Sequence, residues 1–271
     1  MEVIWKLLET CIIPIITYGS ELWNPNKKET KMAESILDNI IKRILMVPTS
    51  TPREVLYMET GLKDVQYRMK ESRISMKCRL EKTKNETINS ILELDESNAW
   101  NKITTALMTE LNLPQLLPTY TKGKAKRILK NALSTNLSNR LNETGQGKSK
   151  VNYLTQNREL SHDNETPVYI NKMNRMETSR IFKARTRMLD VKNNFRGKYT
   201  DNLCRGCRQT DETQAHILEM CPKMHENNTD TKVLNRDIFT NDVNKLKKAA
   251  INILRIEKLL SQSEAPNGAT R

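Results

Sequence analysis

Three of the five cysteines in this 271-residue chain fall within one short stretch, in register with one of its three histidines. They follow the spacing C-x2-C-x8-H-x4-C at Cys204, Cys207, His216 and Cys221. A Cys-x2-Cys pair forms a tight chelating turn, because Gly206 frees the backbone to fold both thiolates toward one point. His216 and Cys221 lie close to one helical turn apart, so a short helix can complete a tetrahedron. The pattern predicts a closed, structural Zn²⁺ site with no open position for catalysis.

Two alternatives to this site remain open in the sequence. His225 is a rival to His216 as a ligand, although the spacing favours His216. The cysteines could also form a buried thiol cluster without metal, which would be unusual beside three neighbouring cations, Arg205, Arg208 and Lys223. Cys11 and Cys78 lie in apolar or helical settings typical of inert core thiols. Clustered cysteines in odd number favour metal binding in a reducing compartment over a disulfide framework.

The composition favours a mainly α fold with small cores. Hydrophobic residues make up 37% of the chain and charged residues 28%. Eight Gly and nine Pro are too few for an architecture with many turns, such as a β-sandwich. The length allows one large or two small domains.

The charge predicts a polyanionic partner. The formal net charge is +13, and the phosphate backbone is the commonest polyanion that such a protein meets. Codon bias toward Lys, Asn and Ile is the alternative origin of this charge. No apolar run approaches the roughly 20 residues that span a bilayer, so we expect no membrane partner and an intracellular, nuclear protein.

Hydrophobic periodicity predicts a series of helices. Residues 28–46 have a strongly amphipathic pattern. A helix start is expected at Thr51, as N-cap, followed by Pro at the first helical position and by Glu54 closing a capping box, with Gly61 as the C-cap. Further helical segments are expected over 3–16 (buried), 65 into the 80s, 87–94, 98–111, 122–142, 174–189 and 241–260.

The residues around the cysteines resemble a known family. The Cys204-x2-Cys207 pair, the stretch Glu212 to Leu218 and Cys221-Pro222 look like the C-terminal CCHC zinc knuckle of non-LTR (LINE-type) retrotransposon polyproteins. The segment from Arg180 to Leu189 is similar to the arginine-bearing segment that leads into that knuckle.

The N-terminal part carries an independent resemblance to the same family. Ile13 to Trp23 (IPIITYGSELW) resembles the segment just after the palm of their reverse transcriptases, where the thumb begins. Val47 to Pro52 and Glu59 to Leu62 continue it in the right order. The resemblance covers roughly residues 3–82 and 174–260, with a divergent middle.

The resemblance at both ends, together with helical periodicity and the flexible stretch from Gly145 to Lys150 in the middle, gives a helical plan with flexible connections. A thumb-like helical bundle is expected at 1–84 and a helical linker region with a flexible end at 85–150. The basic helix and zinc knuckle follow at 151–240, then a C-terminal helix at 241–260 and a disordered tail at 261–271.

Departures from the family decide which activity to expect. Reverse transcriptases hold two Mg²⁺ with paired carboxylates in a Tyr-x-Asp-Asp turn, and this chain has no Asp-Asp dipeptide. The tail after Cys221 lacks an acidic cluster with Lys typical of an endonuclease. We therefore expect no catalysis from this chain alone, although the parent family is an RNA-directed DNA polymerase.

The resemblance also implies partners and binding residues. RNA or DNA, as template or primer–template, and an upstream palm and fingers domain are the expected partners, and no small-molecule substrate is expected. For the helix that begins at residue 65, a core stripe with a solvated basic face is as good an interpretation as direct phosphate contact. The alternatives to nucleic-acid binding are a zinc-stabilised protein–protein interaction module, which predicts an exposed apolar patch on residues 28–46, and a non-functional remnant. The expected phosphate contacts are Arg68, Arg73, Lys77, Arg180, Lys183, Arg185 and Arg187.

Overall fold

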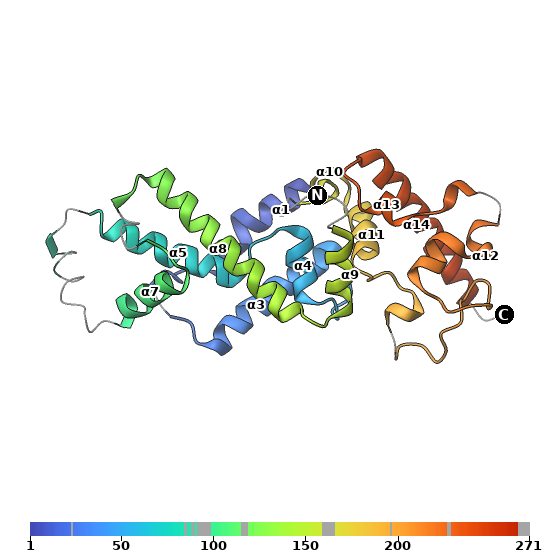
Figure 1. Cartoon of the computed structure of the whole chain (residues 1–271), viewed down its shortest axis with the longest axis horizontal. Helices are drawn as coiled ribbons and strands as arrows, with labels where there is room; N and C mark the ends of the chain where they lie inside the picture. Colours follow the sequence, from blue (N-terminus) through green and yellow to red (C-terminus); the bar gives the residue numbers. More distant parts are fainter. Residues whose placement is uncertain are drawn as a thin grey trace. The chain divides into compact units, whose positions relative to one another are not determined.

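The computed structural model describes residues 1–22, 24–83, 86–87, 90, 99–114, 119–158, 166–195, 197–226 and 229–264 (Figure 1). Over these ranges the chain is mainly helical and forms no β-strand, which confirms the predicted mainly α fold. One isolated antiparallel bridge joins Leu203 and Asp211. In the described part, every helix is too short or too polar to cross a lipid bilayer.

The chain divides into two compact units, each built from segments that are distant in sequence. Unit 1 comprises Met1–Ile4, Ile41–Gly61 and Gly145–Arg271, and unit 2 comprises Trp5–Ile40 and Leu62–Thr144. One boundary coincides with Gly145, in the glycine-containing stretch expected to be flexible. The regions predicted from the sequence are continuous stretches of chain, whereas each compact unit combines separate stretches. Local periodicity predicts helices but does not indicate which distant helices pack together.

The N-terminal apolar segment is one helical run with a wide turn inside it. Helix α1 (Glu2–Leu7) passes through the π-helical turn η1 (Leu8–Ile12) into α2 (Ile13–Ile16). Pro14 lacks an N–H and cannot continue the α-helical ladder, which explains the local change of turn. The segment was expected to be buried, but several of its large apolar side chains are exposed: Val3, Leu7, Ile12 and Ile15. Cys11 is exposed as well, so it is not the core thiol that was expected.

Helix α3 (Lys27–Leu45) confirms the predicted amphipathic helix. Its buried face carries Leu37, Ile41 and Leu45, all at most 1% exposed. Met32 and Ile36 belong to the apolar pattern but remain 63% and 47% exposed. Periodicity therefore predicts the helix, while the neighbouring elements decide which apolar residues are covered.

Helix α4 (Arg53–Thr60) begins later than its sequence signals suggest. Pro52 occupies the N-cap position without a side-chain cap, and the Thr51 hydroxyl instead donates to the Pro48 carbonyl at 2.7 Å. The expected capping box is therefore wrong. Gly61 is the C-cap as predicted, with φ 67°, and its N–H donates to the Tyr57 carbonyl.

Unit 2 also contains α5 (Val65–Leu80), α7 (Ala99–Glu110) and α8 (Lys122–Gly145, of which Gly145 belongs to unit 1). Asp64 caps α5 by accepting the Tyr67 N–H at 2.8 Å. Helix α5 packs on α7, and α8 buries leucines at four-residue spacing, Leu129, Leu133, Leu137 and Leu141. The predicted helix 87–94 falls mostly outside the described residues.

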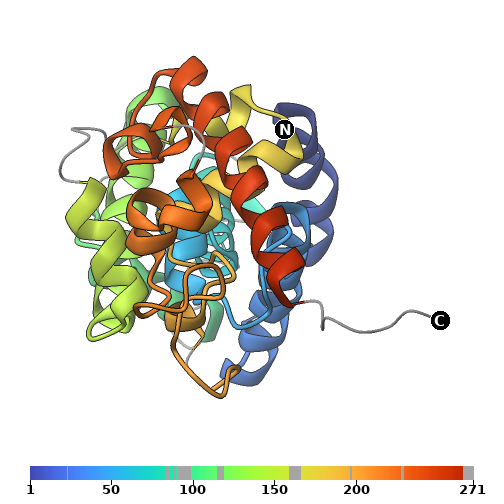
Figure 2. The same cartoon turned by 90° about the vertical axis from the view of Figure 1, so that its right-hand side faces the viewer.

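The core of unit 1 lies between α11 (Arg175–Arg185) and α14 (Val243–Glu264), as Figure 2 shows with α14 in red. Asn174 and Glu177 form a capping box at the start of α11. Helix α14 runs four residues past its predicted end at 260, and the rest of the predicted tail lies outside the described residues. The remaining helices are α9 (Ser149–Arg158), α10 (Val168–Lys172), α12 (Pro222–His225) and α13 (Asn235–Ile238).

Candidate metal centre and charged surfaces

Cys204 and Cys207 lie on a short hairpin. The bridge between Leu203 and Asp211 closes it, the Cys204 N–H donates to the Thr210 carbonyl at 2.8 Å, and the Arg208 N–H donates to the Cys204 carbonyl at 3.0 Å. These bonds fold the Cys-x2-Cys loop back on itself, so that both thiols face one side.

His216 and Cys221 are joined by a π-helical turn, η6 (His216–Met220). The Cys221 N–H donates to the His216 carbonyl at 2.7 Å, across five residues. On an α-helix, residues five apart lie about 140° apart around the axis, so their side chains point to different faces. The wider turn corrects the expectation of an ordinary helical turn and accounts for the H-x4-C spacing.

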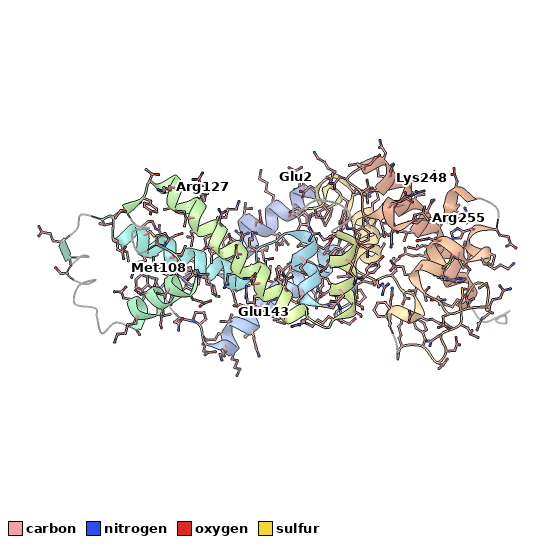
Figure 3. All side chains as sticks on the ribbon, in the orientation of Figure 1. Glu2, Met108, Arg127, Glu143, Lys248 and Arg255 are labelled. Carbon is pink, nitrogen blue, oxygen red and sulfur yellow. The ribbon has the colours of Figure 1, made fainter. Side chains whose placement is uncertain are left out.

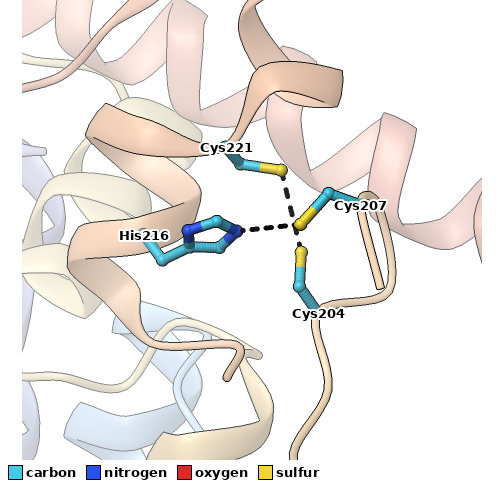
Figure 4. Close-up of side chains that lie close together, drawn as sticks. All are labelled: Cys204, Cys207, His216 and Cys221. Carbon is cyan, nitrogen blue, oxygen red and sulfur yellow. Dashed lines mark hydrogen bonds between the residues drawn. The ribbon is translucent and has the colours of Figure 1, made fainter. Parts of the chain in front are cut away.

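The four side chains converge on one point, as predicted (Figure 4). One ligand atom from each lies within 4.8 Å of the others. The Cys204 and Cys221 sulfurs are 3.7 Å apart, and the Cys207 sulfur is 3.3 Å from His216 Nε2. Two thiolates bound to one tetrahedral Zn²⁺ at about 2.3 Å lie about 3.8 Å apart, so the donor set fits this ion in number, chemistry and spacing.

Gly206 serves the site in a different way from the one its sequence position suggested. It is not among the glycines with positive φ. A Cβ at this position would lie 2.5 Å from Met224 Cε and 3.4 Å from Cys221 Sγ. Gly206 is therefore needed for space, because Met224 and a ligand sulfur pack against its backbone.

His216 and His225 have different partners. The Thr210 hydroxyl lies 3.2 Å from Nδ1 and 3.4 Å from Nε2 of His216, and this Nε2 lies 3.3 Å from the Cys207 sulfur. Such a second contact fixes the orientation of a ligating imidazole. His225 lies outside the cluster, and its Nδ1 contacts the Thr231 hydroxyl at 2.9 Å. The geometry thus selects His216 over its rival.

The metal-free thiols differ in acidity. Burial opposes ionisation of Cys207, but the Gln209 N–H and the His216 side chain outweigh it and lower the pKa of this thiol to about 6. Burial, together with the electrostatic influence of the neighbouring Cys204, raises the pKa of Cys221 to about 12. At neutral pH a bound cation would therefore displace a proton from Cys221.

A buried ion pair anchors the hairpin. Arg205, inside the Cys-x2-Cys loop, pairs with Glu212 at 2.7 Å, and both side chains are at most 5% exposed. The Arg205 and Lys192 N–H groups also donate to the Glu212 carboxylate. Gln214 donates to the Ala184 carbonyl of α11, and η6 packs on α14. The ligand-bearing segments are thus part of the core of unit 1.

Three of the expected phosphate contacts are buried, which corrects their assignment. Arg73 is 4% exposed and donates to Asn24; Lys77 is 9% exposed and donates to Asn101 and Thr105. Arg185 is 3% exposed and pairs with Glu59. Their charge is satisfied inside the protein, so for α5 the core interpretation of these positions holds.

The other four expected contacts are partly or fully accessible. Arg68 pairs with Glu9 at 3.0 Å and Arg180 with Glu257 at 3.2 Å. Lys183 is half-buried. Arg187 is exposed, and its guanidinium lies 4.1 Å from the centroid of the Tyr153 ring. Their role as phosphate contacts stays a prediction.

Two basic helix faces were missed by the sequence reasoning. The α14 basic face spans about three helical turns on the side opposite the buried one, and Figure 3 shows Lys248 and Arg255 extending from it. The α8 basic face covers the first turns of α8, where Arg127 is labelled. All eight side chains are exposed: Lys247, Lys248, Arg255 and Lys258 on α14, and Lys122, Lys126, Arg127 and Lys130 on α8.

A signal for both faces was present in the sequence. Residues 121–142 contain six cations and no acidic residue, and 245–258 is a run rich in Lys. The α8 segment lies outside the residues that resemble the family, so the resemblance does not mark its cations as phosphate contacts.

Comparison with known proteins adds no relative: no protein-family model, curated protein or solved structure matches the chain.

Proposed function

We propose that this chain binds nucleic acid through exposed basic helix faces, in a unit whose fold is stapled by Zn²⁺. The observation that carries the proposal is the packing of the four-ligand cluster against a helix with a basic solvent face. Element η6, which bears His216, packs on α14, and the α14 basic face presents four exposed cations. A structural metal would thus hold a phosphate-binding surface in place.

Zn²⁺ would be held by Cys204, Cys207, His216 and Cys221 in a site with no open position. Bound there, the ion supplies folding free energy and no catalysis. The chain's own residues then do the binding. The α14 basic face extends roughly 16 Å along the helix, enough to meet several successive phosphates.

The binding we propose is electrostatic and largely independent of base sequence. Lys248 lies 3.6 Å from Asp230, but both groups are more than 60% exposed, so this pair contributes little and leaves Lys248 free to exchange partners. Lysines and arginines on a helix surface can contact phosphates without contacting the base edges that carry sequence information.

The lineage of the chain is part of the same proposal. We infer that it corresponds to the C-terminal, non-catalytic part of a non-LTR retrotransposon reverse transcriptase, from the thumb onward. The order of the resembling segments supports this inference, and so does the convergence of the four CCHC residues. A nuclear location follows from this lineage and is proposed with it.

The test is the salt dependence of binding to single-stranded RNA and to an RNA–DNA hybrid. Replacing Lys247, Lys248, Arg255 and Lys258 by Gln should weaken binding and reduce the slope of log Kd against log[salt] by up to about 4. The equivalent change of the α8 basic face shows whether it contributes too.

The matched control removes the same charge elsewhere. Lys6, Lys27, Lys28 and Lys31 are exposed and lie outside both faces; their change to Gln should leave the slope within about 1 of wild type. Absence of binding by the wild-type protein at low salt, or binding indifferent to salt, would reject the proposal.

One observation favours a second candidate function, a zinc-stabilised protein–protein interaction module. Met32 and Ile36 form an exposed apolar pair within the segment where that hypothesis expects a patch. It predicts protein partners that co-purify with the wild type and are lost with the M32Q/I36Q variant, in preparations free of nucleic acid.

A further inference from the structure

Unit 1 contains a cavity of about 350 Å³ beside the metal centre. It is lined by α9, by the segment that follows α11, and by the residues that lead into η6. This volume is at the lower end of the range for ligand sites. It is too small for a nucleic-acid duplex and suits a compact group.

Two cations line the cavity, Lys150 and Arg187. Lys150 Nζ lies 3.1 Å from Met188 Sδ and 4.7 Å from the centroid of the Phe195 ring. Within the described ranges neither cation is within ion-pair distance of a carboxylate. Burial lowers the pKa of Lys150. Glu219 is the acidic side chain of the lining, so the charge of the cavity favours an anion.

Arg187 adopts a backbone conformation that seldom holds a side chain. Its φ is 53°, and it follows α11 where the Met188 N–H donates back to the Lys183 carbonyl at 2.7 Å. Glycine is the usual residue at this position of a helix C-terminus. A left-handed arginine costs about 1 kcal/mol, so glycine would be the less strained residue at this position.

The guanidinium of Arg187 is arranged as a stacking platform. The guanidinium carbon lies over the Tyr153 ring, 4.1 Å from its centroid, and Arg187 is an exposed residue. Planar guanidinium groups and aromatic rings are the surfaces on which unpaired bases stack. Four carboxamides belong to the polar lining: Asn193, Asn194, Gln214 and Asn235. Gln214 donates to the Ala184 carbonyl and Asn194 to the Leu189 carbonyl, while Asn235 accepts the Tyr153 hydroxyl, so the remaining donor and acceptor positions are what the edge of a base can meet.

We propose that this cavity holds one unstacked nucleotide of a single-stranded nucleic acid, with its phosphate between Lys150 and Arg187 and its base against the Arg187 guanidinium. The inference rests on the proposed nucleic-acid binding and deepens it: the basic helix faces hold the backbone, and the cavity takes a single base out of the strand.

The test is calorimetric titration of the zinc-loaded full chain with uridine 5′-monophosphate, with inorganic phosphate and with uridine. The nucleotide should bind at least about tenfold more tightly than either part, because the site contacts both phosphate and base. Arg187→Gly should weaken the nucleotide by about tenfold or more while leaving the unfolding temperature unchanged or higher, because glycine relaxes the backbone.

Arg208→Gly is the matched control. Arg208 is also exposed and left-handed, with φ 58°, and it does not line the cavity. The Arg208→Gly variant loses the same charge as Arg187→Gly and removes the same left-handed backbone strain. Its affinity for the nucleotide should therefore equal that of the wild-type protein.

The outcomes separate this inference from the proposed function. If the chain binds long single strands with steep salt dependence but the nucleotide binds no better than inorganic phosphate, or R187G binds it like wild type, the cavity is no nucleotide site and the proposed function stands. If long single strands do not bind at low salt, the proposed function fails, whatever the cavity does.

Discussion

The glycine between the two hairpin cysteines is the residue on which the centre's packing depends most directly. In Gly206→Ala the new Cβ meets Met224 and the Cys221 sulfur. We expect a loss of about 1–3 kcal/mol in unfolding free energy and weaker zinc binding, measured by denaturant titration and by competition with a chelator.

Gly123→Ala is the control for that change. Nothing lies within 4 Å of a Cβ at Gly123, which stands in the first turn of α8. The same substitution there should leave zinc affinity unchanged and stability equal or higher by up to about 1 kcal/mol. Equal effects at both positions would contradict the steric role of Gly206.

Substitution of Thr210 tests whether its hydroxyl orients the His216 imidazole for metal binding. Thr210→Val removes the contact to His216 Nδ1 with little change of shape, and we expect zinc affinity to fall about tenfold. Thr231→Val removes the corresponding contact to His225 and should leave zinc affinity unchanged. An unaltered affinity in Thr210→Val would show that the imidazole is oriented without the Thr210 hydroxyl.

At the residue scale the sequence predicts ligands better than it predicts surface cations. The four metal ligands can be read from spacing because their chemistry has few other uses in one short stretch. The role of Arg185 cannot be predicted from local sequence. Its charge suggested a contact with a nucleic-acid phosphate, but it pairs with Glu59, which lies 126 residues away in the chain. Charge is visible in a sequence, whereas burial depends on packing.

The π turn between His216 and Cys221 is an element whose length is matched to its task. Inserting one Ala after Met220 breaks the five-residue hydrogen bond and rotates Cys221 by up to about 100°. We expect the Co²⁺-loaded variant to lose its tetrahedral absorption bands. Met220→Ala is the control: Met220 is exposed, so its spectrum should match the wild type.

Hydrophobic periodicity predicts where helices lie, but it does not predict which of their apolar residues are buried. It located α3, α11 and α14 closely, because apolar residues recur at helical spacing in all three. It did not show that α3 would cover Leu37 and expose Met32, because the apolar residues of α3 extend around more than one face of the helix. The turn η6 was also missed, because no propensity marks a single π turn.

At the scale of the molecule, the metal centre belongs wholly to unit 1. Chelation should therefore lower the unfolding temperature of one calorimetric transition and leave the other unchanged. A thousandfold excess of Zn²⁺ over Kd should stabilise the first by about 4 kcal/mol. A C11S/C78S variant, which keeps all four ligands, should respond in the same way.

The result also bears on whether the chain is a non-functional remnant. That alternative expects marginal stability without cooperative, zinc-dependent unfolding. One or two transitions that do not respond to zinc would contradict the structural role of the metal.

The interleaving of the two units has a consequence during synthesis. Unit 2 is complete once residue 144 has left the ribosome, although Ile41–Gly61 has by then emerged without the rest of its own unit. At about 5–20 residues per second, Glu59 waits roughly 6–25 s for Arg185. The nascent chain must therefore keep the Glu59 carboxylate and helix α4 without their partners in unit 1 until residue 185 and the three cysteines of the metal centre have been synthesised.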